Sequence, residues 1–185
     1  MNTIGYSNIS PGPWGTWLES KDAKRGYYAC GMALRVQDDL GNDEDDTTVN
    51  AVYMYYCQLG EWDYGYGEYL NYGFDGNWKS DVMCPENKFI NYVKIKSVIP
   101  KGPGEGDKFD DVALNGIMIS CRDEQNPNDY EVLKLEYNSE GDFKDQLWIG
   151  FDDKVICGGQ VRMDLSTGND RTGVSGISFK FCPLT

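Results

Sequence analysis

Pairs of adjacent carboxylates are the residues in this sequence whose types and spacing could support acid–base chemistry. Asp45 and Asp46 begin the stretch DDTTVNAVYMYYC, and Asp110 and Asp111 begin the stretch DDVALNGIMISC. Two carboxyl groups can cleave a glycosidic bond when they face each other across a sugar, about 5–10 Å apart. Neighbouring residues on a strand point in different directions, and Asp side chains often accept backbone N–H groups in turns. We therefore favour a structural role for these aspartates over catalysis, and no catalytic residue is predicted.

The composition argues against several other kinds of chemistry. The chain has 185 residues with 17 basic and 30 acidic side chains, and its net charge of −13 disfavours binding to nucleic acid or anionic lipid. It has no histidine and no CxxC spacing, so we expect no metal site, no cofactor and no histidine-based nucleophile. The acidic stretches GNDEDD and GEGDKFDD do not fit an EF-hand, and solvated loops explain them better than calcium sites. No apolar run is long enough to cross a bilayer, so membrane insertion is not expected.

The two acidic stretches are copies of a unit that occurs a third time, more weakly, as DRTGVSGISFKFC from Asp170. After the polar residues of each copy, apolar residues alternate with a period of two, which predicts a strand with one buried face. The buried positions would be Val52, Met54 and Tyr56; Ile117, Ile119 and Cys121; and Ile177, Phe179 and Phe181. The polar residues that we expect to fix the adjoining turns are Asp45, Asp46, Asn50, Asp110, Asp111, Asn115, Asp170 and Ser175.

A second strand precedes each acidic stretch. The segments YACGMALRV, FINYVKIKS and VICGGQVRM superimpose without gaps, and a basic residue recurs in them at Arg35, Lys96 and Arg162. A Gly/Trp element stands further upstream as PWGTW and FDGNW, and less clearly as QLWIG. The units cover roughly residues 12–57, 74–121 and 143–182 of a single domain. One such unit cannot bury its own apolar face, so we expect three of them to pack around a common axis.

The six cysteines fit this repeat and indicate disulfide bonds formed in an oxidising compartment. Cys30 and Cys157 are equivalent positions, and so are Cys57 and Cys182, which predicts the bridges Cys30–Cys57 and Cys157–Cys182. In the middle unit both cysteines are displaced from the matching positions, so we expect the third bridge to be Cys84–Cys121.

These motifs resemble the vitelline membrane outer layer protein family, whose units carry Trp-Gly-x-Trp, a strand with a cysteine, and Asp-Asp-Thr-Ala-Leu-Asn-x-Ile followed by a cysteine. WGTW, DDTTVNAV, DDVALNGI, CPENKF and VICGGQVRM carry the resemblance across roughly residues 12–182. The third unit departs from the pattern, with Arg171 in place of the second Asp and Ser175 in place of Asn. The resemblance implies an all-β protein, a β-prism of three Greek-key sheets with pseudo-threefold symmetry. It also implies a secreted protein of an egg coat or other extracellular layer, associated with carbohydrate and weak transfer between chito-oligosaccharides.

The best binding candidate in the residues themselves is the aromatic segment EWDYGYGEYLNYGF, from Glu61 to Phe74. Aromatic faces beside carboxylates and amides suit sugar rings, which offer C–H faces and hydroxyl rims. The candidate carbohydrate-binding residues are Trp62, Tyr64, Tyr66, Tyr69 and Tyr72. The competing explanations are that tyrosines suit half-buried strands, or that these rings serve assembly with neighbouring proteins.

We therefore expect a secreted structural or carbohydrate-binding component of an extracellular layer. Its expected partners are glycans or glycoproteins of the extracellular matrix, with self-assembly as a further expectation. The alternatives are a weak glycan-processing enzyme similar to a chito-oligosaccharide transferase, or a defence lectin or toxin module.

Overall fold

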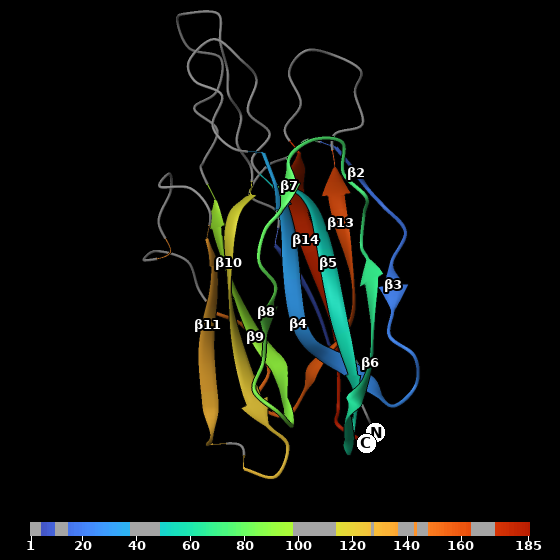
Figure 1. The fold of residues 1–185 in the computed structure, drawn as a ribbon, viewed down its shortest axis with the longest axis vertical. Coiled ribbons are helices and arrows are strands. Elements are labelled where there is room, and N and C mark those ends of the chain that lie inside the picture. Colours follow the sequence, from blue (N-terminus) through green and yellow to red (C-terminus); the bar gives the residue numbers. More distant parts are fainter. Residues whose placement is uncertain are drawn as a thin grey trace, which may run out of the picture.

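The computed structural model describes residues 5–9, 15–37, 49–97, 114–126, 128–136, 143, 148–163 and 173–185. These residues form three antiparallel sheets that stand side by side with their strands along the long axis of the molecule (Figure 1). The all-β expectation and the three-sheet prism are both confirmed. Within these residues no helix has the length and apolar character that a membrane span requires.

Each sheet is built on a long central hairpin, and we name the sheets after the first strand of that hairpin. The β4 sheet contains β4 (Tyr27–Val36), β5 (Val49–Gln58), β6 (Glu61–Tyr69), β7 (Asn77–Trp78) and β8 (Val82–Met83), in the order β6-β5-β4-β7, with β8 also on β4. The β9 sheet contains β9 (Lys88–Ser97), β10 (Leu114–Asp123), β11 (Tyr130–Glu136) and β12 (Ile149–Gly150), in the order β11-β10-β9-β12. The β13 sheet contains β1 (Gly5–Ile9), β2 (Thr16–Trp17), β3 (Lys21–Asp22), β13 (Val155–Met163) and β14 (Val174–Cys182), in the order β1-β14-β13-β2, with β3 also on β13.

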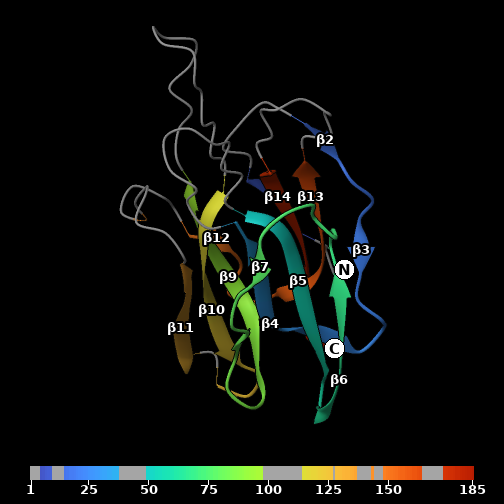
Figure 2. The same ribbon diagram turned by 45° about the horizontal axis from the view of Figure 1, so that its top comes forward.

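The short strands pass from one repeat to the sheet of another. β7 and β8 precede β9 in the chain but pair with β4, and β12 precedes β13 but pairs with β9. β2 and β3 precede β4 and pair with β13, which closes the ring (Figure 2). Every sheet therefore contains strands from two of the predicted units, so no sheet is complete without a strand from another unit.

The predicted match of QLWIG to the other Gly/Trp elements is wrong in register. Gly150 lies opposite Tyr92, which is equivalent in the repeat to the residues of β4 and β13 that lie opposite β8 and β3. Trp17 and Trp78 instead lie opposite the recurrent Arg162 and Arg35. β12 is therefore the counterpart of β3 and β8, not of β2 and β7.

The core lies where the inner faces of the three central hairpins meet. The alternation predicted from the sequence is confirmed, because the nine residues assigned to the buried faces of β5, β10 and β14 are all 0% exposed. The preceding strands add Met32, Leu34, Val93, Ile95 and Val161 to the same core. Since no single hairpin encloses this apolar surface, its burial requires all three sheets together.

Two β-bulges recur at matching places in the three hairpins. The register shifts leave Cys30, Asn91 and Cys157 without an opposite residue in the first bulge, and Asn50, Asn115 and Ser175 in the second. The last three residues are buried, and they lie inside β5, β10 and β14 rather than in the turns before them. A bulge leaves backbone groups outside the ladder, and a buried polar side chain there can satisfy them.

The recurrent arginines hold the Gly/Trp elements in place. Arg35 Nε donates to the carbonyl oxygen of Gly76 at 3.0 Å, and Arg162 Nε donates to that of Gly15 at 3.0 Å. Both glycines have a positive φ, of 84° and 86°, which a residue with a Cβ rarely adopts. The third recurrent basic residue, Lys96, is buried at 1% exposure.

The disulfides are Cys30–Cys57, Cys84–Cys121 and Cys157–Cys182, the three pairs that the repeat predicts. The first and third each join the two strands of one hairpin, and the second joins the residue after β8 to β10 in the neighbouring sheet. Asn91 takes the bulge position that a cysteine holds in the other two hairpins.

Candidate functional site

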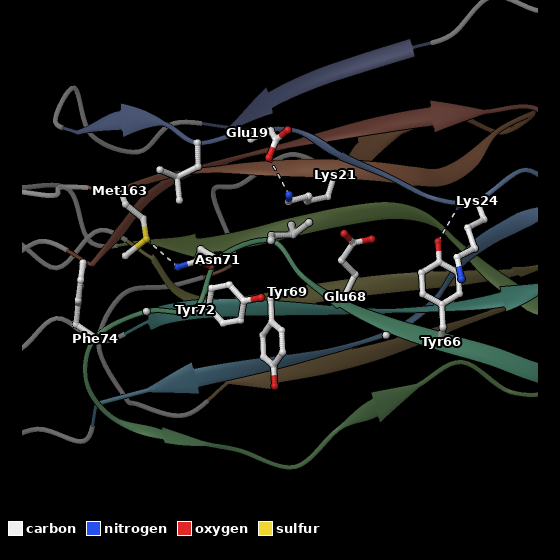
Figure 3. Close-up of a pocket in the computed structure, with 14 residues that line it drawn as sticks. Glu19, Lys21, Lys24, Tyr66, Glu68, Tyr69, Asn71, Tyr72, Phe74 and Met163 are labelled. Carbon is white, nitrogen blue, oxygen red and sulfur yellow. Dashed lines mark hydrogen bonds and ion pairs between the residues drawn. The ribbon is translucent and has the colours of Figure 1, made fainter.

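A cleft of about 620 Å³ opens where the edge of the β4 sheet meets the edge of the β13 sheet (Figure 3). One wall is formed by β6 and the loop 70–74 that follows it, and the other by the segment 18–24 around β3. β3 and β6 also run side by side in both ribbon views (Figures 1 and 2). The cleft therefore joins two segments that are far apart in the sequence.

Alternation along β6 decides which of its side chains face the cleft. Glu68 lies opposite the core residue Met54, and Tyr66 lies opposite the core residue Tyr56, so both point toward the inner side of the sheet edge. Tyr69 lies opposite Tyr53 and points to the outer face, so its ring forms the rim of the cleft. Figure 3 shows Glu68 and Tyr69 on opposite sides of the β6 ribbon.

The loop after β6 is fixed against β5 by an amide side chain. Asn71 is buried, its Oδ1 accepts from Val52 N at 3.0 Å, and its Nδ2 donates to Asn50 O at 2.6 Å. The same Nδ2 lies 2.7 Å from Met163 Sδ on the β13 sheet. One buried side chain of the cleft lining thus joins the β4 sheet to the β13 sheet.

Two further contacts hold the tip of this loop. Gly73 has a φ of 67°, and a Cβ there would lie 2.7 Å from Asn50 O, so the loop can follow β5 this closely only with a glycine. The Tyr72 carbonyl accepts from Arg35 Nη1 at 3.2 Å. The Tyr72 ring is therefore carried on a constrained backbone, although the residue is 75% exposed.

Charged side chains line the cleft in balanced number, with Glu19 and Glu68 against Lys21 and Lys24. Lys21 Nζ lies 2.9 Å from Glu19 Oε2, and this hydrogen bond lowers the pKa of Glu19 and raises that of Lys21. Glu19 therefore stays ionised at neutral pH.

Tyr66 is held by the opposite wall. Its hydroxyl accepts a hydrogen bond from Lys24 N at 2.7 Å, and Lys24 Nζ lies 4.3 Å from the centre of its ring. Burial raises the pKa of the Tyr66 hydroxyl, so it remains neutral at physiological pH. This ring therefore closes the far end of the cleft by bridging β6 to the β3 segment.

The comparison with protein-family models identifies the family. The model described as vitelline membrane outer layer protein I matches residues 6–184, nearly the whole chain. The chain belongs to this family. Two curated relatives are vitelline membrane outer layer protein 1 homologs. The one from Mus musculus is 28% identical over 60% of this chain and 53% of its own length, and the one from Homo sapiens is 32% identical over 40% and 34%. The chain thus matches about half or less of the length of these relatives.

Two of the solved structures similar to this chain are plant lectins of the same fold. Malaysian banana lectin has a TM-score of 0.55 at 11% identity, covering 99% of both chains. A mannose-binding jacalin-related lectin from Ananas comosus has a TM-score of 0.54 at 9% identity, covering 98% of both chains. The TM-scores establish the shared fold. At identities this low they do not establish function, which must be argued from the site.

Three of the five aromatic residues predicted to bind carbohydrate, Tyr66, Tyr69 and Tyr72, line the cleft of this family member. Trp62 is half-buried, its ring centre lies 5.5 Å from that of Phe89, and it is not part of the described cleft lining. Tyr64 lies in β6, and its side chain is outside the described residues.

The wall formed by residues 18–24 was not among the predicted site residues. Its proximity to β6 results from the pairing of β3 with β13, and no local signal in Leu18, Glu19 or Lys21 indicates that contact. The predicted turn residues Asp45, Asp46, Asp110, Asp111 and Asp170 lie outside the described residues. Of the remaining predicted structural residues, Ser175 Oγ donates to the carbonyl of Arg162 at 3.3 Å across the bulge.

Proposed function

We propose that this protein is a secreted carbohydrate-binding component of an extracellular layer, and that it binds a glycan in the cleft between β6 and the β3 segment. The observation that carries the proposal is the lining of that cleft, where Tyr69, Tyr72 and Phe74 present exposed rings next to the Glu68 carboxylate and the Glu19–Lys21 pair. Such a site offers stacking for the C–H faces of a sugar and donors and acceptors for its hydroxyls.

The charge balance of the cleft favours a neutral sugar. Two carboxylates and two ammonium groups line it, and one of each is already paired. An anionic glycan would have to approach Glu68 and Glu19 on a protein whose net charge is −13. Neutral hexoses or N-acetylhexosamines avoid this repulsion.

Secretion and a place in an extracellular layer are part of the proposal. Three disulfides support an oxidising compartment, since such bonds are rare in the cytosol. The family to which the chain belongs is described as an outer layer protein of the vitelline membrane. Glycoproteins of such a layer are the proposed partners.

Binding fits the cleft better than glycoside chemistry. A general acid for glycoside cleavage needs a raised pKa, and Lys21 lowers the pKa of Glu19. Glu19 is therefore a poor proton donor, and Glu68 is the other carboxylate in the described lining. Incubation with N-acetylchito-oligosaccharides followed by mass analysis tests the enzymatic alternative, and products of altered length would support it.

A glycan array with the purified protein tests the binding proposal. We expect hits among neutral glycans, and Tyr72→Ala should weaken them about threefold to tenfold because an exposed stacking ring is lost. Tyr130→Ala is the matched control, because Tyr130 is 66% exposed on β11 and far from the cleft lining. No hit at high protein concentration would contradict the proposal.

A further inference from the structure

A cluster of aromatic rings covers the outer face of the β4 sheet, on the side away from the core. We call Tyr53, Tyr55, Tyr69 and Trp78 the outer aromatic face. The Tyr53 ring centre lies 4.9 Å from that of Tyr55 and 4.6 Å from that of Tyr69. Trp78 lies 5.6 Å from Tyr69 and 6.1 Å from Tyr53. The rings come from β5, β6 and β7, so they span the width of the sheet.

The outer aromatic face results from the alternation of side-chain directions along β5 and from the glycine at position 67. Tyr53 and Tyr55 are the residues of β5 that point away from the core, and Tyr69 lies directly opposite Tyr53. A Cβ at Gly67 would overlap the Tyr53 ring, so Gly67 provides the space in which that ring lies over β6. A glycine inside a strand usually weakens it, and here it makes room for a ring.

Exposed apolar side chains are unevenly distributed over the described residues. Of the eight large hydrophobic residues that are exposed, five lie within residues 69–83: Tyr69, Tyr72, Phe74, Trp78 and Met83. The other three are Tyr130, Val132 and Trp148. Tyr69 and Trp78 belong to the outer aromatic face, and the Tyr72 ring lies against that of Tyr69. A concentration of this kind marks an interaction surface, because single exposed apolar residues are usually scattered.

The outer aromatic face is continuous with the cleft. The Tyr69 ring centre lies 4.8 Å from that of Tyr72, with an angle of 34° between the planes, and both residues line the cleft. Figure 3 shows the two rings together at the rim, with Tyr69 turned to the outer side of β6. A ligand leaving the cleft past Tyr72 therefore meets Tyr69 and then Tyr53 or Trp78, and the Asp81 carboxylate beside Tyr55 offers an acceptor for its hydroxyls.

Two hydrogen bonds hold the backbone that connects Tyr72 to Trp78. Arg35 donates to the carbonyls of Tyr72 and Gly76, on either side of the turn that carries the chain from the cleft to Trp78. Fixed rings lose little conformational entropy when a ligand binds, and phenol hydroxyls at their edges provide hydrogen-bonding partners for a sugar.

We propose that the outer aromatic face is a second glycan subsite, so that the ligand is an extended neutral oligosaccharide running from the cleft over Tyr72 and Tyr69 onto Tyr53 and Trp78. This inference rests on the proposed function of the cleft, and it adds that affinity depends on glycan length. A second copy of the chain could also cover an apolar face of this kind, but continuity with the cleft favours the glycan.

Titration calorimetry with N-acetylchito-oligosaccharides from the monomer to the hexamer tests the inference. We expect the affinity of the wild-type protein to rise with chain length. Trp78→Ala and Tyr53→Ala should each lower the affinity for the hexamer about threefold to tenfold, and should reduce the gain between dimer and hexamer. Tyr130→Ala should leave the whole length series as in the wild-type protein. Circular dichroism and thermal unfolding of each variant exclude loss of the fold as the cause.

The outcomes separate this inference from the proposed function. Binding that is independent of glycan length, or equal losses for dimer and hexamer in Trp78→Ala, would overturn the second subsite and leave the cleft in place. Absence of binding at every length, together with an empty glycan array, would overturn both. A dimeric mass in sedimentation that becomes monomeric in Trp78→Ala would assign the face to self-association and reject the glycan subsite.

Discussion

β6 and β11 occupy the same place in their sheets, yet they present different surfaces. Each is the outer strand that pairs with the second strand of a central hairpin, β5 or β10. β6 forms part of one wall of the cleft and contributes Tyr69 to the outer aromatic face, and the loop after it is bound to Asn50 and Arg35. β11 exposes Tyr130 and Val132 and buries Leu135. The framework therefore supplies equivalent positions, and side chains and loops decide which position binds.

The disulfide that joins the sheets containing β6 and β11 should make the largest contribution to stability. Cys84 follows β8 on the β4 sheet, Cys121 lies in β10 beside β11, and the two are 37 residues apart in the sequence. Replacing both by alanine should lower the free energy of unfolding by about 4 kcal/mol, because the unfolded chain gains entropy. Urea unfolding measures this, and a loss below about 1 kcal/mol would contradict the expectation.

The close approach of the Gly/Trp element to β4 should give the next largest effect. Gly76 and Gly60 both have a positive φ, of 84° and 78°, but a Cβ at Gly76 would overlap the Val36 backbone and one at Gly60 meets nothing. We expect Gly76→Ala to cost about 3 kcal/mol and Gly60→Ala about 1 kcal/mol. Equal losses in thermal unfolding would show that the backbone angle alone matters.

Weakening the hydrogen bonds of Arg35 to the loop after β6 should lower the local stability of that loop and leave β11 unaffected. Arg35→Lys retains the charge but loses the geometry that reaches both Gly76 O and Tyr72 O, and we expect a loss of about 1–2 kcal/mol. Arg25→Lys, at an exposed position, is the control and should change stability by less than about 0.5 kcal/mol. Hydrogen exchange should show faster exchange in residues 70–76 with no change in β11. Equal stability of the Arg35→Lys variant and the wild-type protein would contradict this role.

The smallest effect concerns Tyr56, which lies in β5 opposite Tyr66 of β6, and the response of stability to alkaline pH. Burial raises the pKa of Tyr56 above its ordinary value of about 10, and its hydroxyl has no hydrogen-bond partner among the described residues. The folded state holds the proton more tightly than the unfolded state, so this contribution is complete below about pH 10 and is lost as the pH rises further. Tyr56→Phe should stay within about 1 kcal/mol of wild type at pH 7 and lose less stability between pH 9 and 12. Urea unfolding at each pH measures this, and an equal loss of stability in the two proteins between pH 9 and 12 would contradict the expected role of Tyr56.

Much of the framework could be predicted because the signals that specify it are local and repeated. Alternation in β5, β10 and β14 indicates the buried faces, since successive strand residues point to opposite sides. Comparison of the three units also indicates which cysteines are equivalent, and with them the pairs Cys30–Cys57 and Cys157–Cys182. The tyrosines of β6 stood out as a binding candidate because glycines separate them and no helix period competes.

The cleft itself could not be predicted, because its two walls meet through an exchange of short strands. β2 and β3 have only two residues each, too few for a periodic signal, and they pair with β13 at the other end of the chain. The same exchange explains why β12 pairs with β9 in a different register from the one that the match of QLWIG predicted. Asn50 was expected in a turn and lies in a bulge, because matching polar letters do not show where a ladder shifts register.

The sequence by itself determined the strands of the three central hairpins, their buried faces and the cysteines that bond, because each depends on neighbours along the chain or on comparison of similar stretches. Only the tertiary structure decided that Lys24 meets Tyr66, that Asn71 reaches Met163, and that Tyr69 joins the cleft to an outer face. Those contacts depend on how three sheets exchange their edges around one core. Pairing between distant segments is stabilised by burial of the whole core, and no short stretch of residues encodes it.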